Sequence, residues 1–596
     1  MPPLRASASS VELTADSSMV IAGSVLAKHA DSQEGKLRAA AAVIEADVRL
    51  CIVACDVIAM PGDVADRAAK RIEAECSIPF DRILLCASHT HHAPSTLTVH
   101  GYEREQAFTA QLEDAIVRAA ADACAKLDRP GAGSNDVEVE MGFALTQEAT
   151  VGRNSRILLD DGAIAWGGYT PEEEMRPTGP FDPDLAVLAF RRPGGAPACA
   201  LFNHSTHNIG VLGKPRSPAV YGLAAQGLEE AVGAPVLFLP GAFGSTHNQK
   251  VPAPEAVHRI RSAVEQGMAQ LRWGLRGPLL SRKAALEYTL REFDETRDDE
   301  AVAAYCTKRF PADQAASYID VFRAMRKELA PHRGETRSTW IHAILLGDVA
   351  LVGVPGEMFA SLGMAIRRRS PFRHTFVVGL ANDYVGYIPD REGMELGGYQ
   401  CWTGFHSLVA PGTGERMVDE AVSMLNEIHA EVSDPTGTRS AEPAIRPMRA
   451  GDAPLIQRFY NTLSPETRRV FRPAGWNMSL AKCRAIVNEF LQGARYDMVV
   501  EADGEIVGWA WLGRLDQDMP TLGIGLSEAC TGRGLGTELM GMLFVEGKLR
   551  GKTGICLTLL QDNERARKLY EQFDFEIVGR HTGGDGEEYY KMEMRY

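Results

Sequence analysis

The sequence predicts an α/β protein made of two domains, and three observations lead to that prediction. Short apolar runs of strand length alternate with alanine-rich helical stretches along roughly the first 430 residues,. A polar segment with two prolines then interrupts the pattern at 431–443,. In addition, the chain has 596 residues, whereas single cores stop growing near about 250 to 300 residues,.

The first domain is predicted to span residues 1–430. Its clearest strands are the apolar runs at 50–55, 84–86, 349–354 and 376–380, and its clearest helix is the alanine-rich stretch at 108–126. Apolar runs of this length, bounded by polar residues, are typical of buried strands. Strands interleaved with helices favour an α/β layer arrangement.

The second domain is predicted at 444–596, after the linker at 431–443. The pattern restarts with a short strand at 444–448 and helices through 452–492. Strands at 497–502 and 505–512, a glycine-rich loop and a further helix follow. Each part is long enough to bury a core of its own.

Charge and composition exclude several classes of partner. The formal net charge of -15 repels phosphate backbones and anionic lipid surfaces, so we expect neither nucleic acid nor membrane as a partner,. No run of about 18 apolar residues occurs, and the start of the chain lacks an apolar segment,. Several of the eleven cysteines lie in apolar runs and no CxxC pair appears, which indicates buried thiols,. We expect a cytoplasmic protein whose oligomeric state the sequence leaves open.

Histidines follow three of the predicted strands of the first domain. They are His89, His91 and His92 after 84–86, His204 and His207 after 198–202, and His247 after 236–239. Chemistry in α/β proteins gathers at strand ends. Alternate side chains of an extended backbone face one way, so His89 and His91 can point into one cleft. A single His-x-His could equally be structural, but three such strand ends favour a zinc site.

Two more stretches follow in order, Val354-Pro355-Gly356-Glu357-Met358-Phe359 and Gly379-Leu380-Ala381-Asn382-Asp383-Tyr384-Val385-Gly386-Tyr387. With the three histidine stretches they resemble the neutral/alkaline ceramidase family, over roughly residues 15–430. The resemblance implies a ceramidase-like α/β metallohydrolase domain with one Zn²⁺ ion. In that family a zinc-bound water attacks an amide carbonyl.

The resemblance also implies roles for individual residues. The zinc ligands would be His89, His204, Glu357 and Tyr387. His91 would shuttle a proton or orient the water, and Tyr399 would stabilise the oxyanion. An arginine of the segment 152–156 falls near the family's substrate-contacting segment.

The sequence also departs from the family pattern. The family's Ser-x-Asp segment has no aspartate at 217–222, and its Gly-Asp-x-x-Pro segment is replaced at 244–248. His92, His207 and His247 are additions, to be interpreted either as loop histidines with ordinary hydrogen bonds or as a modified metal site. The secreted ceramidases carry an export signal and a trailing immunoglobulin-like domain that this sequence does not show, so we expect a small polar N-acyl compound rather than ceramide as substrate.

A glycine-rich loop characterises the second domain. It follows the strand at 521–526 and consists of Thr531, Gly532, Arg533, Gly534, Leu535, Gly536 and Thr537. Such a loop before a helix suits a pyrophosphate, although a plain tight turn would have the same composition. Downstream, 557–575 is predicted as a strand, an asparagine helix start and a helix that ends in an aromatic residue. Together these features resemble the GNAT acetyltransferase superfamily over the whole second domain.

This second resemblance implies a mixed-sheet α/β domain that binds acetyl-CoA and acetylates an amine. The loop 531–537 would hold the pyrophosphate, although Thr531 stands where the family often has Gln or Arg. Asn563 would contact the pantetheine arm and Tyr570 would protonate the departing thiolate. Tyr570 could instead be a core aromatic. Glu528 is a candidate for assisting amine deprotonation.

The two resemblances together predict a bifunctional enzyme. It would combine zinc-dependent hydrolysis of an N-acyl bond with acetyl-CoA-dependent N-acetylation of a small amine-bearing metabolite. The alternative is an acetyltransferase whose ceramidase-like domain is only a substrate-binding or scaffolding module.

Overall fold

The computed structural model describes residues 3–128, 137–211, 213–275, 277–432, 443–471, 478–502, 504–527, 530, 534–583 and 586–596. The chain divides into two compact units, Met1–Val432 and Ser433–Tyr596. The linker was predicted to begin at residue 431, but Glu431 and Val432 form the end of helix α9 (Thr413–Val432). The rest of that linker, 433–442, lies outside the described residues. No helix in the described part of the chain is long and apolar enough to cross a bilayer.

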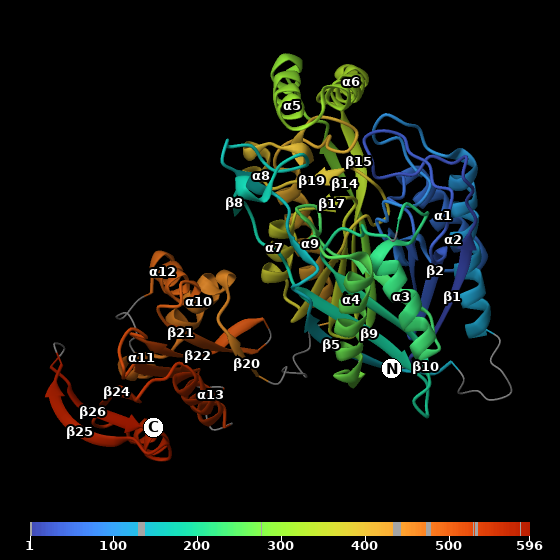
Figure 1. Ribbon diagram of the computed structural model, residues 1–596. Helices are drawn as coiled ribbons and strands as arrows, with labels where there is room; N and C mark the ends of the chain where they lie inside the picture. Colours follow the sequence, from blue (N-terminus) through green and yellow to red (C-terminus); the bar gives the residue numbers. More distant parts are fainter. Residues whose placement is uncertain are drawn as a thin grey trace. The chain divides into compact units, whose positions relative to one another are not determined.

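The first unit begins with a four-stranded sheet of order β1-β2-β3-β4. Its strands are β1 (Arg5–Leu13), β2 (Leu37–Glu45), β3 (Arg49–Cys55) and β4 (Ile83–Ala87). The first two pairings are antiparallel, and β4 joins β3 in parallel through α1 (Gly62–Cys76). Helix α1 and α2 (Gln106–Asp128) cover one face of this sheet (Figure 1).

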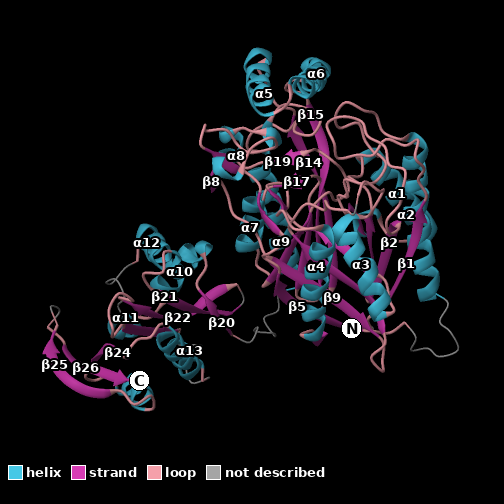
Figure 2. Ribbon diagram, viewed as in Figure 1, coloured by secondary structure: helices cyan, strands magenta, loops and turns pink. Residues whose placement is uncertain are grey.

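Two more sheets share a central core with the other face of the first (Figure 2). One has the order β11-β10-β9-β5-β13 and consists of β5 (Glu140–Gln147), β9 (Asp184–Arg191), β10 (Pro197–His204), β11 (Val236–Pro240) and β13 (Arg272–Leu275). The other has the order β14-β15-β16-β18 and consists of β14 (Leu279–Thr289), β15 (Thr336–Leu346), β16 (Val349–Gly353) and β18 (His374–Val378).

Helices cover the outer faces of these two sheets. Helices α3 (Ala219–Val232) and α4 (Ala253–Ala269) pack on the five-stranded sheet. Helices α7 (Ala360–Arg369) and α9 pack on the sheet that contains β14. Alternation along β10 shows the layering, because Leu201 faces the central core and Phe202 faces α3 and α4,.

The remaining elements of the unit lie in the connections between the sheets. They are β6 (Gly152–Asn154), β7 (Ile157–Leu159), β8 (Glu174–Pro177), β12 (Thr246–Asn248), β17 (Glu357–Met358), β19 (Tyr387–Ile388) and helix α8 (Arg391–Leu396). Helices α5 (Glu295–Arg309) and α6 (Ala312–Leu329) lie side by side at one end of the unit (Figure 1). Short parallel pairing of β17 with β19 places Glu357 opposite Tyr387.

The second unit is a seven-stranded mixed sheet of order β20-β21-β22-β23-β24-β26-β25. Its strands are β20 (Ala444–Pro447), β21 (Tyr496–Ala502), β22 (Glu505–Gly513), β23 (Thr521–Leu526), β24 (Gly554–Leu560), β25 (Glu576–Thr582) and β26 (Glu588–Arg595). Helices α10 (Ala453–Thr462) and α12 (Leu480–Leu491) share one apolar cluster with the sheet. Helices α13 (Leu535–Leu549) and α14 (Glu564–Glu571) contribute to another, and α11 (Pro465–Val470) follows α10.

The predicted α/β class is confirmed. The apolar runs at 50–55, 84–86 and 349–354 correspond to β3, β4 and β16, and the alanine-rich stretch at 108–126 is the interior of α2. In the second unit the strands predicted at 497–502, 505–512 and 521–526 are β21, β22 and β23. The helices predicted through 452–492 are α10, α11 and α12 in the described part of that segment, and Pro465 begins the second of them,.

We predict that residues 441–596 fold when expressed alone. The apolar clusters around Trp509 and around Leu543 are built from residues of this segment, so its burial does not depend on the rest of the chain,. Thermal unfolding followed by circular dichroism should show one cooperative transition, and the fragment 1–432 serves as the counterpart. An unfolded 441–596 fragment beside a well-folded full chain would contradict this prediction.

Candidate functional site

Three histidines and one glutamate converge where the strands of the first unit end. His89 and His91 follow β4, His207 follows β10, and Glu357 begins β17. One ring nitrogen of each histidine lies within 4.8 Å of those of the other two. His89 has a left-handed backbone (φ 61°), which turns its ring out of the line of β4 and toward the other two rings,. Residues from three separate segments therefore meet at one point.

The donor atoms lie at similar distances from one another. The Nε2 atoms of His89 and His91 are 3.1 Å apart. Oε2 of Glu357 is 3.3 Å from Nε2 of His89 and 3.3 Å from Nε2 of His207. The Tyr387 hydroxyl is 3.4 Å from Nε2 of His207.

Backbone carbonyls fix the orientation of all three rings. Nδ1 of His89 donates to Ile58 O at 2.7 Å, Nδ1 of His91 to Gly23 O at 3.1 Å, and Nδ1 of His207 to Thr246 O at 2.6 Å. A carbonyl oxygen only accepts, so in the neutral ring the proton is on Nδ1 and the Nε2 lone pair faces the cluster. Burial lowers the pKa of His91 and of His207, which favours these neutral rings,.

Glu357 is the anionic member of the cluster. Burial by itself would raise the pKa of this carboxyl group, whereas His89 and His207, when protonated, hold the pKa well below its usual range. Oε1 accepts a hydrogen bond from the Tyr384 hydroxyl at 3.0 Å. Oε2 is buried without a hydrogen-bond partner among the described residues. A buried carboxylate oxygen without a partner is costly, and a cation would satisfy it.

This donor set fits a zinc ion. Donor atoms bound to one tetrahedral zinc at about 2.0 to 2.1 Å lie about 3.3 Å from one another. The four separations given above are close to this value, and the three histidine nitrogens all lie within 4.8 Å of one another. Each histidine also donates its other ring N–H to a carbonyl, which is the usual outer-shell arrangement of zinc ligands.

His204, which was predicted to bind zinc, lies outside this cluster of donor atoms. It shares the face of β10 with Phe202, two residues earlier, and therefore points toward α3,. Its Nδ1 is 2.6 Å from the Tyr221 hydroxyl and its Nε2 is 3.0 Å from Glu148 O. Both ring nitrogens are thus engaged outside the cluster, and His207 stands in the position that the prediction gave to His204.

Tyr399 lies beside the cluster, within an aromatic stack. Its ring centroid is 6.0 Å from that of Tyr387, and it stacks on Trp166 at 4.7 Å and on His406 at 4.8 Å. Its hydroxyl is 3.1 Å from Nε2 of His100. No sequence pattern indicated Trp166, His100 or His406, because these residues come from three segments that are distant from one another in the chain. Tyr384 lies in the stretch 379–387, and its sequence context indicated no role for it.

The arginines of the segment 152–156 are already engaged. Arg153 pairs with both carboxylate oxygens of Glu174, at 2.9 and 2.7 Å. Arg156 is buried and donates to Gln400 and to two carbonyls of the 393–397 segment. These contacts position the loop that leads to Tyr399.

The other added histidines have ordinary partners. Nε2 of His92 accepts from the Gly210 backbone N–H at 3.5 Å, and burial lowers the pKa of His92 to about 4. His247 stacks on His207 with ring centroids 5.1 Å apart. Burial lowers the pKa of His247 to about 3, which keeps its ring neutral.

A second cleft lies in the second unit, between β23 and β24. These parallel strands are paired only at Thr521 and Cys556, so they diverge toward their carboxyl ends. The cleft has a volume of ≈ 790 Å³. Its wall includes Leu526, Gly534, Gly536, Thr537, Asn563 and Tyr570.

The start of α13 forms one end of this cleft. Gly534 precedes the helix with φ 82°, a conformation that favours glycine,. Gly536 and Thr537 line the cleft, whereas Leu535 packs into the apolar core. Thr531, Gly532 and Arg533, the other predicted loop residues, and Glu528 lie outside the described residues.

Asn563 and Tyr570 belong to α14. The Asn563 side chain caps the helix by accepting from the Ala566 N–H at 3.2 Å,. Tyr570 is buried and its ring packs against Phe575, as expected for a core aromatic residue. Tyr570 also lines the cleft. Burial raises the pKa of Tyr570, which keeps its hydroxyl protonated.

Comparisons with known proteins agree with this division of the chain. Residues 456–575 match the model of the acetyltransferase (GNAT) family. The neutral ceramidase of Pseudomonas aeruginosa is similar in structure, with 19% identity and a TM-score of 0.55, over 72% of this chain and 75% of that chain. A ceramidase complexed with C2 has 17% identity and a TM-score of 0.55, over 75% of this chain and 82% of that chain.

An N-acetyltransferase from Staphylococcus aureus Mu50 matches with 19% identity and a TM-score of 0.24, over 26% of this chain and 99% of that chain. A search of curated protein sequences found no match. The chain therefore joins an N-terminal region with the neutral ceramidase fold to a C-terminal GNAT acetyltransferase domain.

Proposed function

We propose that this protein is a bifunctional enzyme, a zinc-dependent amide hydrolase joined to an acetyl-CoA-dependent N-acetyltransferase. The hydrolase proposal depends on one observation above all. Three oriented Nε2 lone pairs and an unpartnered carboxylate oxygen converge within zinc-binding distances of one another. A module that only bound substrate would not need this set of donors.

In the hydrolase unit, His89, His207, Glu357 and Tyr387 would hold the zinc. When bound, the ion supplies a Lewis acid for an amide carbonyl. His91 has its proton on Nδ1, so its free Nε2 can accept a proton beside the reacting atoms,. The Tyr399 hydroxyl, held by His100, can donate to the oxygen that becomes negative during acyl transfer,.

In the second unit, the cleft between β23 and β24 would hold acetyl-CoA. The backbone N–H groups at the start of α13 face the pyrophosphate, and Asn563 contacts the pantetheine arm,. Tyr570, protonated at neutral pH because burial raises its pKa, can give its proton to the departing thiolate,. The acceptor would be a small amine-bearing metabolite.

Both activities act on nitrogen. Hydrolysis of an N-acyl compound releases an amine, and acetylation consumes one, so the two units would serve one small-molecule sequence. The described cysteines are all free, which agrees with a reducing, cytoplasmic location,. We place neither nucleic acid nor membrane among the partners, in line with the net charge of -15,.

We predict that His207, and not His204, is needed for metal. His207→Ala and Glu357→Ala should reduce zinc from about one ion per chain to near zero, because each removes a donor. His204→Gln should retain the metal, since His204 bonds outside the cluster. Elemental analysis of the purified variants measures this, with circular dichroism as the check on folding.

The reverse result, with zinc lost in His204→Gln and retained in His207→Ala, would restore the assignment made from sequence. Zinc retained in Glu357→Ala would remove the basis of the hydrolase proposal. For activity, a panel of N-acyl compounds should be hydrolysed by the parent protein, with activity lost to a chelator and restored by zinc.

We predict that Gly534 and Tyr570 affect different steps of acetyl transfer. Gly534→Val places a side chain on the cleft wall, so acetyl-CoA affinity should fall about tenfold or more,. Gly551→Val is the matched control, because Gly551 also has a positive φ (66°) and open space around it but does not line the cleft.

Tyr570→Phe keeps the ring and removes the proton. Acetyl-CoA affinity should be nearly unchanged, while turnover falls by about 10²- to 10⁴-fold. Calorimetric titration with acetyl-CoA gives the affinity, and thiol release with a panel of small amines gives the turnover. If the parent protein does not bind acetyl-CoA, the proposal of acetyl transfer is contradicted and only the resemblance in fold remains.

A further inference from the structure

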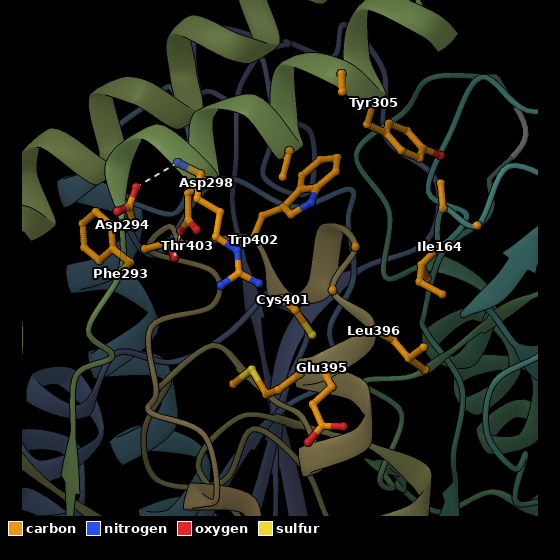
Figure 3. A pocket seen from close by; sticks show the side chains of 18 of the residues that line it. Ile164, Phe293, Asp294, Asp298, Tyr305, Glu395, Leu396, Cys401, Trp402 and Thr403 are labelled. Atoms are coloured by element: carbon orange, nitrogen blue, oxygen red, sulfur yellow. Dashed lines mark hydrogen bonds between the residues drawn. The ribbon is translucent and has the colours of Figure 1, made fainter.

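A separate pocket of ≈ 720 Å³ lies in the first unit, beside the loop that carries Tyr399. Its wall comes from α5, from the segment 161–164 and from the segment 394–403. Apolar side chains form much of that wall, among them Ile164, Phe293, Leu396 and Trp402 (Figure 3). Charged side chains of both signs complete the wall. A pocket of this size is typical of small-molecule sites.

Arg291 is the buried cation of this wall that lacks a carboxylate partner among the described residues. It follows β14 by two residues and is 9% exposed. Its guanidinium donates to Cys401 O at 2.6 Å and to Ser407 Oγ at 2.8 Å, both neutral acceptors. Its Nε is buried without a hydrogen-bond partner, and no carboxylate of the described residues lies within 4.0 Å. Burial lowers the pKa of Arg291, as expected for a cation without a close anion,.

Two other buried arginines of this region have such partners. Arg309 pairs with Asp161 and Glu173, at 2.6 and 2.5 Å. Arg326 pairs with Glu295 and Asp299, at 3.0 and 2.7 Å. Isolated buried charges are expensive, and proteins normally pair them. Arg291 therefore differs from Arg309 and Arg326 in having no carboxylate partner among the described residues.

The acidic groups closest to Arg291 along the wall are engaged elsewhere. Asp298 accepts from the Thr403 hydroxyl at 2.5 Å, and Asp294 caps α5 by accepting from the Arg297 N–H at 2.9 Å (Figure 3). Asp161 pairs with Lys308 as well as Arg309. Glu292 and Glu395 also line the pocket, whose five carboxylates exceed its four cations, so the attraction for an anion is local to Arg291.

We propose that this pocket binds a small molecule bearing a carboxylate or phosphate group, with Arg291 as the partner of that group. A guanidinium in a partly desolvated pocket forms strong charge-assisted hydrogen bonds to either oxyanion. The apolar wall around Trp402 and Leu396 would contact the rest of the molecule. This site is independent of the metal ligands and of the acetyl-CoA cleft.

The pocket shares no metal ligand with the candidate metal centre, but it contacts the loop that carries Tyr399. Arg291 holds Cys401 and Ser407, which lie on either side of His406 and close to Tyr399 in the chain. An anion that satisfies Arg291 would hold this loop and hence the Tyr399 ring. The anion would be either a free effector or a charged group of the substrate itself.

The test is calorimetric titration of the full chain, saturated with CoA so that the acetyl-CoA cleft is occupied. The two titrants are inorganic phosphate and octanoate, against chloride at the same ionic strength. The parent protein should bind one of them saturably. Arg291→Met should weaken that binding by about 10- to 100-fold, and Arg291→Lys by less. Lys308→Gln is the matched control, because Lys308 lines the same pocket but is already paired with Asp161.

The outcomes separate the two sources of the anion. Binding of phosphate indicates a free oxyanion, and binding of octanoate without phosphate indicates a carboxylate on an apolar body. Equal binding in the parent and Arg291→Met would overturn the proposal, as would the absence of saturable binding of both titrants to the parent. If Arg291→Met does not fold, Arg291→Lys and the parent titration decide the question.

Discussion

Three N–H groups that donate to backbone carbonyls determine the candidate metal centre. The carbonyls belong to Gly23, Ile58 and Thr246, in three separate loops. Each bond fixes a tautomer and a ring direction, so that the Nε2 lone pairs face one another before any ligand arrives. The Nε2 lone pairs of His89 and His91, 3.1 Å apart, repel each other. The left-handed backbone of His89 adds a cost of about 1 kcal/mol,. The packed sheets must supply that energy, because the cluster does not stabilise itself without a cation.

Local pattern was enough to predict the layers around this centre. The strands β3, β4 and β16 are continuous apolar runs because both of their faces are buried, and such runs are evident in any sequence,. That histidines at strand ends would gather was also predictable, since the carboxyl ends of neighbouring strands share an edge. The choice between His204 and His207 as the metal ligand was not predictable. It depends on the face of β10 that His204 occupies, which Phe202 shows to be the face toward α3, and on the turn after β10 that carries His207,.

The surroundings of Tyr399 lay beyond sequence reasoning for another reason. Trp166, His100 and His406 contact its ring or hydroxyl, yet they are separated from it by up to 299 positions along the chain. None of them stands in a recognisable pattern, because an aromatic stack places no demand on spacing. Arg291 is a similar case. Its missing counter-ion is a property of what surrounds it in space, and a single arginine after a strand carries no sign of that.

In the second unit, a cleft forms where two neighbouring strands separate. In the first unit strand ends converge on one point, whereas β23 and β24 separate after the pair Thr521 and Cys556. Separation inside a sheet leaves backbone N–H and C=O groups that would otherwise pair with the neighbouring strand. Ile524, Gly525 and Leu526, beyond the one pair with β24, line the cleft along this part of β23. A ligand with its own amide groups, such as the pantetheine arm of acetyl-CoA, can replace the missing strand there. The cleft is therefore suited to an amide-bearing arm because of its backbone, and the side chains of Asn563 and Tyr570 also line it.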